Sequence, residues 1–339
     1  MDLTVTFIVV ALNAASTIGA LFDCLKRQTY PHELIEVILV DGISSDSTKA
    51  EMLRFQHEEK SFRQVKVLDN PKKTLPCGWN VALAAAQGEA ILRVDAHASI
   101  PENFIELNVR DIQNGEDICG GKVVSVPGEN SPFGIVLNEA ENSMFGGSVA
   151  AFRRADTPRY VSTAAFAMYR KAVFDRVGTY NDMLTRTEDN EMHYRMRRAG
   201  YRFYYDPEIV SWRVTRPDLG KLLKQKYLNG YWIGRTLGVE PRCFSLYHFV
   251  PLTFVLAIIL CAVLCAVGIT WPAALLWGAY AFVCIAMTVL AFLGCKERNA
   301  LFLFLPLLFL LLHISYGAGT IVGIAGMLKY RVSRSKTEN

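Results

Sequence analysis

The sequence predicts an α/β domain, with a mixed, mainly parallel sheet flanked by helices, followed by transmembrane helices. Strand-like and helix-like patterns alternate four times within residues 1–100, an order typical of a parallel sheet. Nearly all charged residues lie in 1–246, whereas 247–328 are almost purely apolar. The chain has 339 residues, which leaves enough material for both parts.

The first four strands are expected at short apolar runs rich in Val and Ile, a pattern typical of strands covered on both faces. They span 5–12, 35–40, 65–68 and 91–94, with helices at 16–27, 47–56 and 77–87 between them. In such sheets, ligands bind beyond the carboxyl ends of the strands. The polar residues that fall at these ends are Asn13, Asp41, Asp95 and His97.

The rest of the domain has weaker patterns. Helices are expected at 101–108, 170–177 and 188–199, and strands at 117–125, 163–169, 201–205 and 209–212. The Gly- and Ser-rich stretch 127–160 is expected to be a mobile loop over the site. Helix 217–237 mixes basic and aromatic residues, which fits either a membrane interface or a plain surface helix.

Three apolar segments, 247–268, 271–294 and 300–328, each exceed the ~20 residues that cross a bilayer. Residues 329–339 carry four basic side chains, which favours the cytoplasmic side for this end of the chain. Three spans that start inside would leave the tail outside, and a re-entrant third segment would remove this conflict, so both topologies stay open. The expected division is an α/β domain (1–215), an interfacial helical linker (216–246), a membrane part (247–329) and a basic tail (330–339).

Composition argues against several classes of function. A net charge of +4 is too small to indicate a nucleic acid partner. The eight cysteines show no metal or disulfide spacing, which fits a reducing compartment. No basic residue precedes the first apolar run, so a strand is expected there and not a signal peptide. The apolar segments contain no Asp, Glu, Lys or Arg and only two histidines, His248 and His313, which argues against a channel or transporter.

Two potential metal ligands follow the fourth strand. Asp95 and His97 would project to the same side if the strand continued through them, because side chains alternate along a strand. A carboxylate suits Mg²⁺ or Mn²⁺, and an imidazole shifts the preference towards Mn²⁺ or a softer metal. The alternative interpretation is a strand that ends in a solvated turn.

A second acidic position follows the second strand. Asp41 could accept hydrogen bonds from a base N–H or a ribose hydroxyl. The polar residues after it, Ser44, Asp46 and Thr48, could equally be ordinary caps and turn formers.

Charged residues also precede or begin two of the expected helices. Lys72 and Lys73 could meet a phosphate at a helix N-terminus, or could simply be solvated. Glu188 and Asp189 begin another helix, where one of them could serve as a general base. Their favourable interaction with the helix dipole would by itself explain the pair.

Together these motifs resemble those of family 2 glycosyltransferases with the GT-A fold, over roughly residues 4–215. The resemblance rests on V-D-G-I-S-S-D-S-T at 40–48, a helix with Gly78 and Asn80, V-D-A-H at 94–97 and T-E-D-N-E at 187–191. The V-D-A-H variant, Y-V-S-T-A-A-F-A-M-Y-R at 160–170 and the three apolar segments are similar to the succinoglycan (ExoA-type) branch. His97 replaces the usual second Asp of D-x-D, and the Q-x-x-R-W motif of processive members is absent.

The resemblance implies roles for individual residues. Asp189 would be the catalytic base, and Asp95 and His97 would bind Mn²⁺ or Mg²⁺. The nucleotide-sugar-binding residues would be Ala11, Asn13, Asp41, Lys73, Asn80, Asp95 and Ala96. The acceptor-binding residues would be Glu188, Arg213 and Trp232, and segments 144–160 and 217–237 would hold the acceptor.

The activity implied is that of an inverting, membrane-bound hexosyltransferase of polysaccharide synthesis. Its donor would be a UDP-sugar and its acceptor a polyprenyl-diphosphate-linked saccharide, with the α/β domain on the cytoplasmic face of a bacterial inner membrane. A membrane anchor would raise the effective concentration of such a lipid acceptor. Two alternatives stay open: a dolichol-phosphate-type transfer to a lipid monophosphate, and a membrane-anchored nucleotide-sugar-binding scaffold without activity. The sequence does not indicate the sugar, the linkage or the oligomeric state.

Overall fold

The computed structural model describes residues 2–147, 155–216 and 218–337. It contains two compact units. The first comprises Met1–Val124 and Ala150–Val214, and the second comprises Ser125–Val149 and Thr215–Asn339. Residues 125–149 thus group with the C-terminal helices and not with the α/β unit that precedes them in the sequence.

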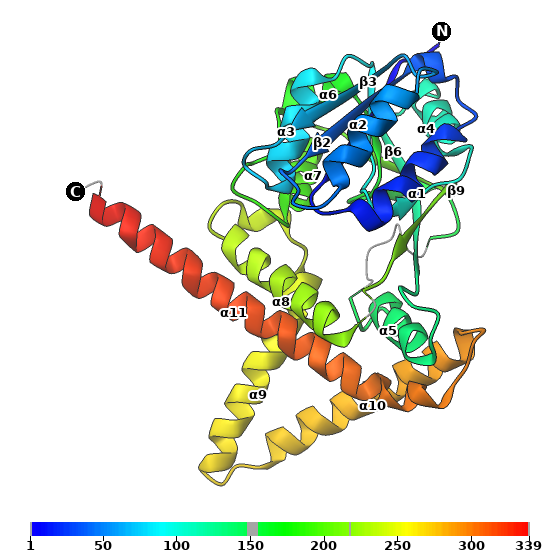
Figure 1. Ribbon diagram of the computed structural model, residues 1–339. Helices are drawn as coiled ribbons and strands as arrows, with labels where there is room; N and C mark the ends of the chain where they lie inside the picture. Colours follow the sequence, from blue (N-terminus) through cyan, green and yellow to red (C-terminus); the bar gives the residue numbers. More distant parts are fainter. Residues whose placement is uncertain (1, 148–154, 217, 338–339) are drawn as a thin grey trace. The chain divides into compact units, whose positions relative to one another are not determined.

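Four strands pair in parallel to form one half of the sheet in the first unit, which Figure 1 shows with its flanking helices. They are β1 (Val5–Ala11), β2 (Ile35–Asp41), β3 (Gln64–Asp69) and β4 (Ala90–Arg93), in the spatial order β3-β2-β1-β4. Helices α1 (Ala15–Lys26), α2 (Thr48–Glu58) and α3 (Leu75–Ala85) connect them. The strand order reverses at β1, because the chain adds β2 and β3 on one side and β4 on the other. This reversal creates the switch point at which open α/β sheets bind ligands.

The other half of the sheet is antiparallel. With it, the sheet has nine strands within the described residues. It contains β5 (Ala98–Ser99), β6 (Ile118–Val126), β7 (Arg159–Val161), β8 (Met168–Arg170) and β9 (Phe203–Val214). Strand β8 pairs antiparallel with β4, and β5 and β7 pair antiparallel with β9. The prediction of two separate strands at 201–205 and 209–212 is therefore wrong, because β9 runs through both.

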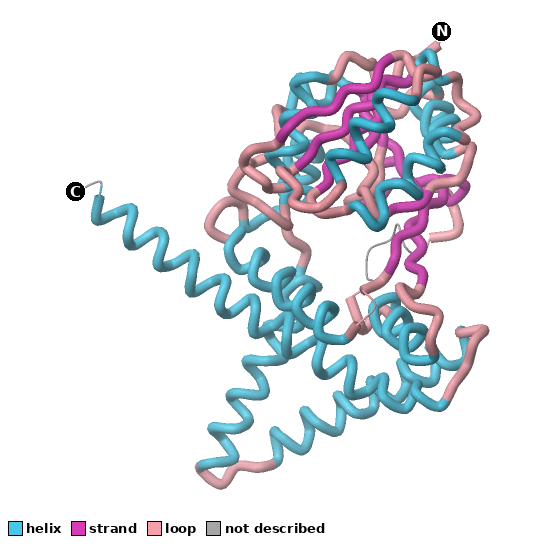
Figure 2. Tube along the Cα trace, in the orientation of Figure 1, coloured by secondary structure: helices cyan, strands magenta, loops and turns pink. Residues whose placement is uncertain are grey.

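Helices cover both faces of this sheet, which gives three layers (Figure 2). Alternate residues of β1 point to opposite faces: Phe7 and Val9 join one apolar cluster, and Ile8 and Val10 join another. The first cluster includes side chains of α1, α2 and α4 (Phe104–Gln113), and the second includes α3, α6 (Lys171–Val177) and α7 (Glu188–Arg198). Burial on both faces explains why the central strands are continuous apolar runs.

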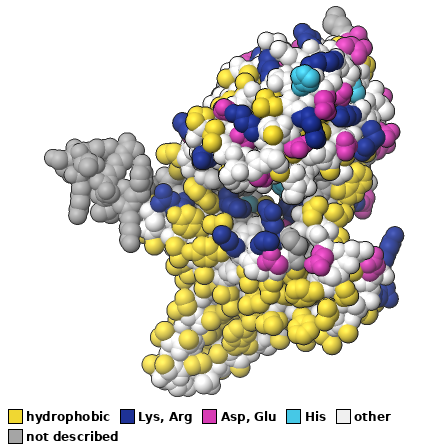
Figure 3. All heavy atoms as spheres, in the orientation of Figure 1, with side chains coloured by type: hydrophobic (Ala, Val, Ile, Leu, Met, Phe, Trp, Pro, Cys, Tyr) yellow, Lys and Arg dark blue, Asp and Glu magenta, His cyan; other side chains and the backbone are white. Residues whose placement is uncertain are grey.

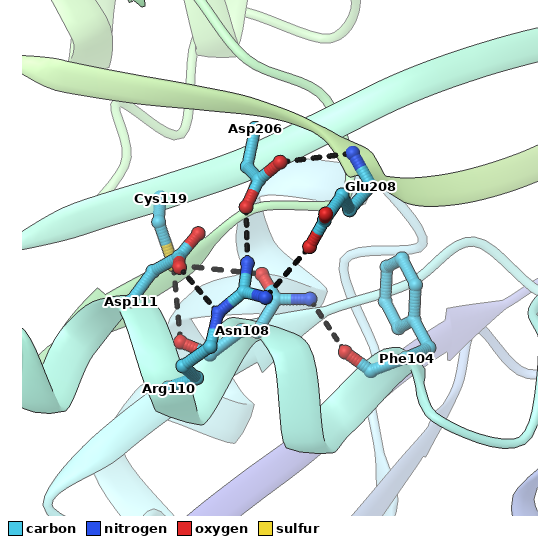
Figure 4. A network of polar contacts seen from close by, with 7 residues as sticks. All are labelled: Phe104, Asn108, Arg110, Asp111, Cys119, Asp206 and Glu208. Atoms are coloured by element: carbon cyan, nitrogen blue, oxygen red, sulfur yellow. Dashed lines mark hydrogen bonds and ion pairs between the residues drawn. The ribbon is translucent and has the colours of Figure 1, made fainter. Parts of the chain in front are cut away.

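A polar network ties α4 to β9 on the first unit (Figure 4). Arg110 donates to the carboxylates of Asp206, Asp111 (3.1 Å) and Glu208 (2.7 Å). Asp111 is only 3% exposed, and its Oδ2 atom has no hydrogen-bond partner. Burial, together with the neighbouring charge of Asp206, raises the pKa of Asp111 to about 6 despite the hydrogen bond from Arg110.

This raised pKa predicts that Asp111→Asn stabilises the protein at neutral pH. A folded-state pKa above the unfolded value of ~3.9 means that the folded protein binds the proton more tightly, so stability falls as pH rises from about 4 to about 6. An uncharged side chain should avoid this loss and add about 1–2 kcal/mol at pH 8, with little effect at pH 4. Thermal unfolding at both pH values measures it. Glu208→Gln, at the exposed end of the network, is the control; a lower melting temperature for Asp111→Asn at pH 8 would refute the interpretation.

Five α-helices form the described part of the second unit. They are α5 (Pro132–Asn142), α8 (Leu219–Thr236), α9 (Val250–Ala266), α10 (Trp271–Gly294) and α11 (Leu305–Thr337). Helix α5 corrects the expectation of a loop over 127–160, since Val136, Leu137 and Ala140 are buried against apolar residues of α8 and α11. Residues 148–154 of that stretch lie outside the described residues.

Helices α8 and α11 cross each other (Figure 1), and glycines let their backbones approach closely. Gly230 and Gly234 on α8, and Gly319 and Gly323 on α11, are each spaced by four and lie against the backbone of the other helix. A Cβ added at any of the four would overlap a backbone carbonyl across the contact. This is the small-xxx-small packing typical of helices in membranes. Helix α11 is also unbroken from Leu305, so the third apolar segment contains no re-entrant turn between that residue and Leu328.

Three helical segments of this unit are long and apolar enough to cross a membrane: Leu246–Ala266, Trp271–Gly294 and Ala300–Leu328. They agree with the predicted segments to within two residues at each end. Hydrophobic side chains cover much of the visible surface of this unit (Figure 3), and Phe282 and Leu303 are 74% and 83% exposed. Contiguous exposed apolar surface of this kind is expected to face lipid.

Candidate active site

The candidate site lies at the carboxyl edge of the parallel strands. Ala11 and Asp41 are paired at the ends of β1 and β2, and Arg93 at the end of β4 is paired with Ile8 of β1. Strands β2 and β4 therefore lie on the two sides of β1. Since neighbouring strands are about 4.8 Å apart, β2, which ends at Asp41, and β4, which precedes Asp95, are about 10 Å apart.

Hydrogen bonds join the loops that follow β1 and β2. The Asn13 N–H donates to the Ser44 hydroxyl (2.9 Å), and the Asn13 carboxamide oxygen accepts from the Ser45 N–H (2.8 Å). Asp41 is 1% exposed and accepts from the Ser44 N–H at 3.1 Å. Asn13 adopts a φ of +52°, a left-handed conformation that Asn tolerates better than most residues. Ser44 thus hydrogen-bonds to both Asn13 and Asp41, which holds the two residues at one edge of the sheet, as their positions at the strand ends predicted.

Asp95 and His97 lie in a turn. Strand β4 ends at Arg93, and the Ala98 N–H donates to the Asp95 carbonyl at 2.9 Å. The expectation that both side chains project from one continuous strand is therefore wrong, because a turn follows Arg93; metal binding by Asp95 and His97 stays a prediction. Asp95 is half-buried and His97 is exposed. Ala98 then pairs with Arg213 of β9, which places Arg213 beside this turn.

Helix α7 brings Glu188 and Asp189 to the site. The Arg93 Nη1 donates to Oδ1 of Asp189 at 2.6 Å. Burial alone raises the pKa of Asp189, but the charge of Arg93 outweighs it and lowers that pKa below its usual value. Glu188 is 4% exposed, and burial followed by the charge of Asp189 raises its pKa well above the usual range. The two neighbours thus differ: Asp189 is held as the carboxylate, whereas Glu188 favours its proton.

One small pocket connects these groups. Its lining includes Asp95, Asp189 and Arg93, and its other wall consists of Ala164, Ala165, Phe166, Ala167 and Tyr169. Asp95 and Asp189 therefore line a shared space, although they are 94 positions apart in the sequence. Asp41 begins at the same sheet edge, one strand beyond β1.

The donor set around this pocket fits a divalent cation that a substrate helps to hold. Among the described residues, no group of three or more His, Cys, Asp and Glu side chains is arranged to bind a metal by itself. Asp95 offers carboxylate oxygens at the pocket, and His97 offers an exposed imidazole two residues away. Mg²⁺ is commonly bound by one or two carboxylates together with substrate phosphates and water, and an imidazole suits Mn²⁺ as well.

The remaining predicted residues occupy mixed environments. Lys73 is exposed in the loop before α3, with a φ of +60°. The Asn80 carboxamide donates to the Tyr180 carbonyl (2.8 Å) and to Asp182 (2.7 Å) and accepts from the Tyr180 N–H (2.8 Å). Asn80 thus fixes the loop that carries Tyr180. Ala96 is buried, and Trp232 lies on α8 in the second unit. Their roles in binding stay predictions.

Sequence reasoning missed Arg93. It lies in an otherwise apolar strand between Leu92 and Val94, and this placement of a cation was the available signal. Its partner Asp189 is 96 positions away, so the contact itself was beyond reach of local patterns.

Comparisons with known proteins identify the class. The fold is similar to that of the mannosyltransferase PcManGT from Pyrobaculum calidifontis, solved in complex with GDP-Man and Mn²⁺, with a TM-score of 0.63, 17% identity, and coverage of 95% of this chain and 88% of the other. Residues 1–349 of S. aureus TarS, solved in complex with UDP, match with a TM-score of 0.50 and 17% identity, over 95% and 92% of the two chains. The fold is that of the GT-A transferases, as predicted.

Sequence comparison then gives the family. The model of glycosyl transferase family 2 matches residues 6–178, and the chain belongs to this family. The succinoglycan biosynthesis protein ExoA of Rhizobium meliloti is 28% identical over 317 residues, which cover 92% of each chain. A dolichyl N-acetyl-alpha-D-glucosaminyl phosphate 3-beta-D-2,3-diacetamido-2,3-dideoxy-beta-D-glucuronosyltransferase of Methanococcus voltae is 24% identical over 321 residues, or 92% of this chain and 95% of the other. The predicted family is confirmed, the predicted similarity to the succinoglycan protein is found as well, and the chain is a glycosyltransferase.

Proposed function

We propose that this chain is an inverting hexosyltransferase that moves a sugar from a UDP-sugar to a polyprenyl-diphosphate-linked saccharide. The observation that carries the proposal is the shared pocket of Asp95 and Asp189 at the sheet edge where Asp41 ends β2. The similarity to the succinoglycan protein and to a transferase named for a dolichyl-linked substrate supports a lipid-linked acceptor. Three helices apolar enough to span a bilayer would keep the site beside that acceptor.

In the proposed reaction, Asp41 accepts hydrogen bonds from the base or ribose of the donor. Asp95 and His97 hold Mn²⁺ or Mg²⁺, which when bound neutralises charge on the departing diphosphate. The acceptor hydroxyl attacks the anomeric carbon from the face opposite the diphosphate, and Asp189 takes the hydroxyl proton. One carbon–oxygen bond forms as the bond to the diphosphate breaks, so the anomeric configuration inverts.

Asp189 acts mainly through position. A carboxylate with a lowered pKa is a weak base at neutral pH, but the acceptor hydroxyl becomes acidic as its bond to the anomeric carbon forms. A base held within the pocket needs no rearrangement at that moment. The catalytic unit is proposed to lie on the cytoplasmic side of a bacterial inner membrane, where nucleotide sugars are made.

A product assay tests the function. Purified full-length protein in vesicles receives labelled UDP-sugars, with either a polyprenyl-diphosphate-linked saccharide or a polyprenyl monophosphate as acceptor. We expect an extended lipid-linked saccharide from one UDP-sugar, with inverted configuration by NMR of the product. A single sugar on the lipid monophosphate would overturn the acceptor assignment. Donor binding without transfer to any acceptor would indicate a non-catalytic binding subunit and overturn the enzymatic proposal.

A further inference from the structure

Arg93 is a buried cation beside the candidate pocket. The residue is 8% exposed and ends β4, two positions before Asp95. Its Nε atom has no hydrogen-bond partner. A guanidinium is costly to remove from water unless neighbouring groups compensate its charge, so a buried position calls for a physical explanation.

Two aromatic rings and one carboxylate provide that compensation. The Arg93 Cζ atom lies 4.2 Å from the centre of the Trp79 ring and 4.9 Å from that of Tyr180. Its Nη1 donates to the Tyr180 hydroxyl and to Asp189. Trp79 and Tyr180 are themselves only 1% and 3% exposed, so neither ring can readily move aside. The guanidinium is therefore clamped in one orientation.

The two side chains of the ion pair differ in their exposure to solvent. The Arg93 side chain is 10% exposed, whereas the Asp189 side chain is 41% exposed and lines the pocket. Only Oδ1 of Asp189 accepts the 2.6 Å hydrogen bond from Arg93. The second carboxylate oxygen thus remains free of this contact while the first is fixed to a rigid partner.

Other titratable groups around Asp189 do not supply the same charge. His193, one turn further along α7, is hydrogen-bonded to Thr163 (2.8 Å) and Tyr169 (2.9 Å). Burial lowers the pKa of His193 to about 4, so it is neutral at pH 7. Glu188 favours its protonated form, and burial raises the pKa of Tyr169 and of Tyr180.

We propose that Arg93 is a positioning residue for sugar transfer, which holds one oxygen of Asp189 so that the other faces the acceptor hydroxyl. This inference rests on the proposed role of Asp189 as the base. Arg93 itself does not touch the reacting atoms in this account. It sets the orientation of the carboxylate and keeps it ionised over the working pH range.

The test compares Arg93→Met and Arg93→Lys with a matched control, Arg170→Met. Arg170 lies beside Ala90 at the other end of β4, where it donates to the carbonyls of Ile112 and Glu116. Arg93→Met should lower kcat by about 10–100-fold with little change in the donor KM. Loss of the Arg93 charge should also move the acidic limb of the kcat–pH profile to higher pH, by about 1–3 units. Arg93→Lys, which keeps the charge without the planar stack, should shift the limb less, and Arg170→Met should leave it in place.

The outcomes separate this inference from the proposed function. If Asp189→Asn abolishes turnover but Arg93→Met leaves the pH limb unmoved, Arg93 is only structural and the inference is wrong. If Asp189→Asn retains turnover, the proposed role of Asp189 as the base is wrong, and the inference about Arg93 falls with it. Adding Arg93→Met to Asp189→Asn should cause no further loss of rate, because both act on one carboxylate. If Arg93→Met does not fold, the pH profile of Arg93→Lys alone decides: an unshifted acidic limb with an unchanged kcat would overturn the inference.

Discussion

Asp189→Asn is expected to lower kcat by about 10²–10⁴-fold, the range typical of a removed general base. Asparagine keeps the shape of the side chain and can still accept a hydrogen bond from Arg93, so the pocket should keep its form. What is lost is the capacity to take the acceptor proton. Donor affinity should stay within a few-fold of the original, because the nucleotide is expected to bind at Asp41 and Asp95.

Steady-state transfer and UDP binding by calorimetry, measured on the same preparation, check this prediction. Glu191→Gln on the same helix is the control, since Glu191 accepts from Arg195 and not from Arg93. It should leave kcat nearly unchanged. Turnover by Asp189→Asn at more than a tenth of the original rate would rule out Asp189 as the base.

Asp95→Asn is expected to have the second largest effect, a fall in kcat/KM of about 10²–10³-fold. The neutral amide would bind a divalent cation more weakly, which leaves charge on the departing diphosphate uncompensated. Chelation of divalent metals should produce a similar loss in the original protein, and added Mn²⁺ should restore it. The variant should need a higher Mn²⁺ concentration than the original protein for half-maximal activity, because its site binds the ion more weakly.

The measurement is a titration of transfer rate with Mn²⁺ and with Mg²⁺ after metal removal. His97→Ala serves as a companion variant, because it tests whether the exposed imidazole contributes to metal affinity. Full activity in the presence of excess chelator would contradict the metal role assigned to Asp95. An Asp95→Asn variant with the original metal dependence would contradict it as well.

The parallel half of the fold could be predicted because its central strands, β1, β2 and β4, are fully buried. Burial on both sides selects the continuous Val- and Ile-rich runs of β1 and β2, and these are visible without partners. Strand β8 contains only three residues and is defined by pairing with β4 and β6, so local pattern could not place its limits. Helix α5 was hidden in a Gly-rich stretch because its apolar face is explained only by distant residues of α8 and α11.

The site was predictable in part for the same reason. Parallel strands share one carboxyl edge, so the polar residues that follow β1, β2 and β4 had to come together. The turn at Asp95 was harder to predict from the sequence, because Val94 continues the apolar pattern of β4 after the last residue of the strand. Arg93 on β4 contacts Trp79 of α3, Tyr180 in a loop and Asp189 of α7. The spacing of residues along the sequence could not predict contacts between four separate segments.

The central claim is that Asp41, Asp95 and Asp189 surround one nucleotide sugar and one cation. A structure of the full-length protein with UDP and Mn²⁺, with the metal located by its anomalous scattering, tests this claim most directly. We predict Mn²⁺ within coordination distance of the Asp95 carboxylate, the nucleoside against Asp41, and Asp189 open to the space beyond the diphosphate. A nucleotide bound away from this sheet edge, or Mn²⁺ that does not contact Asp95, would contradict the account.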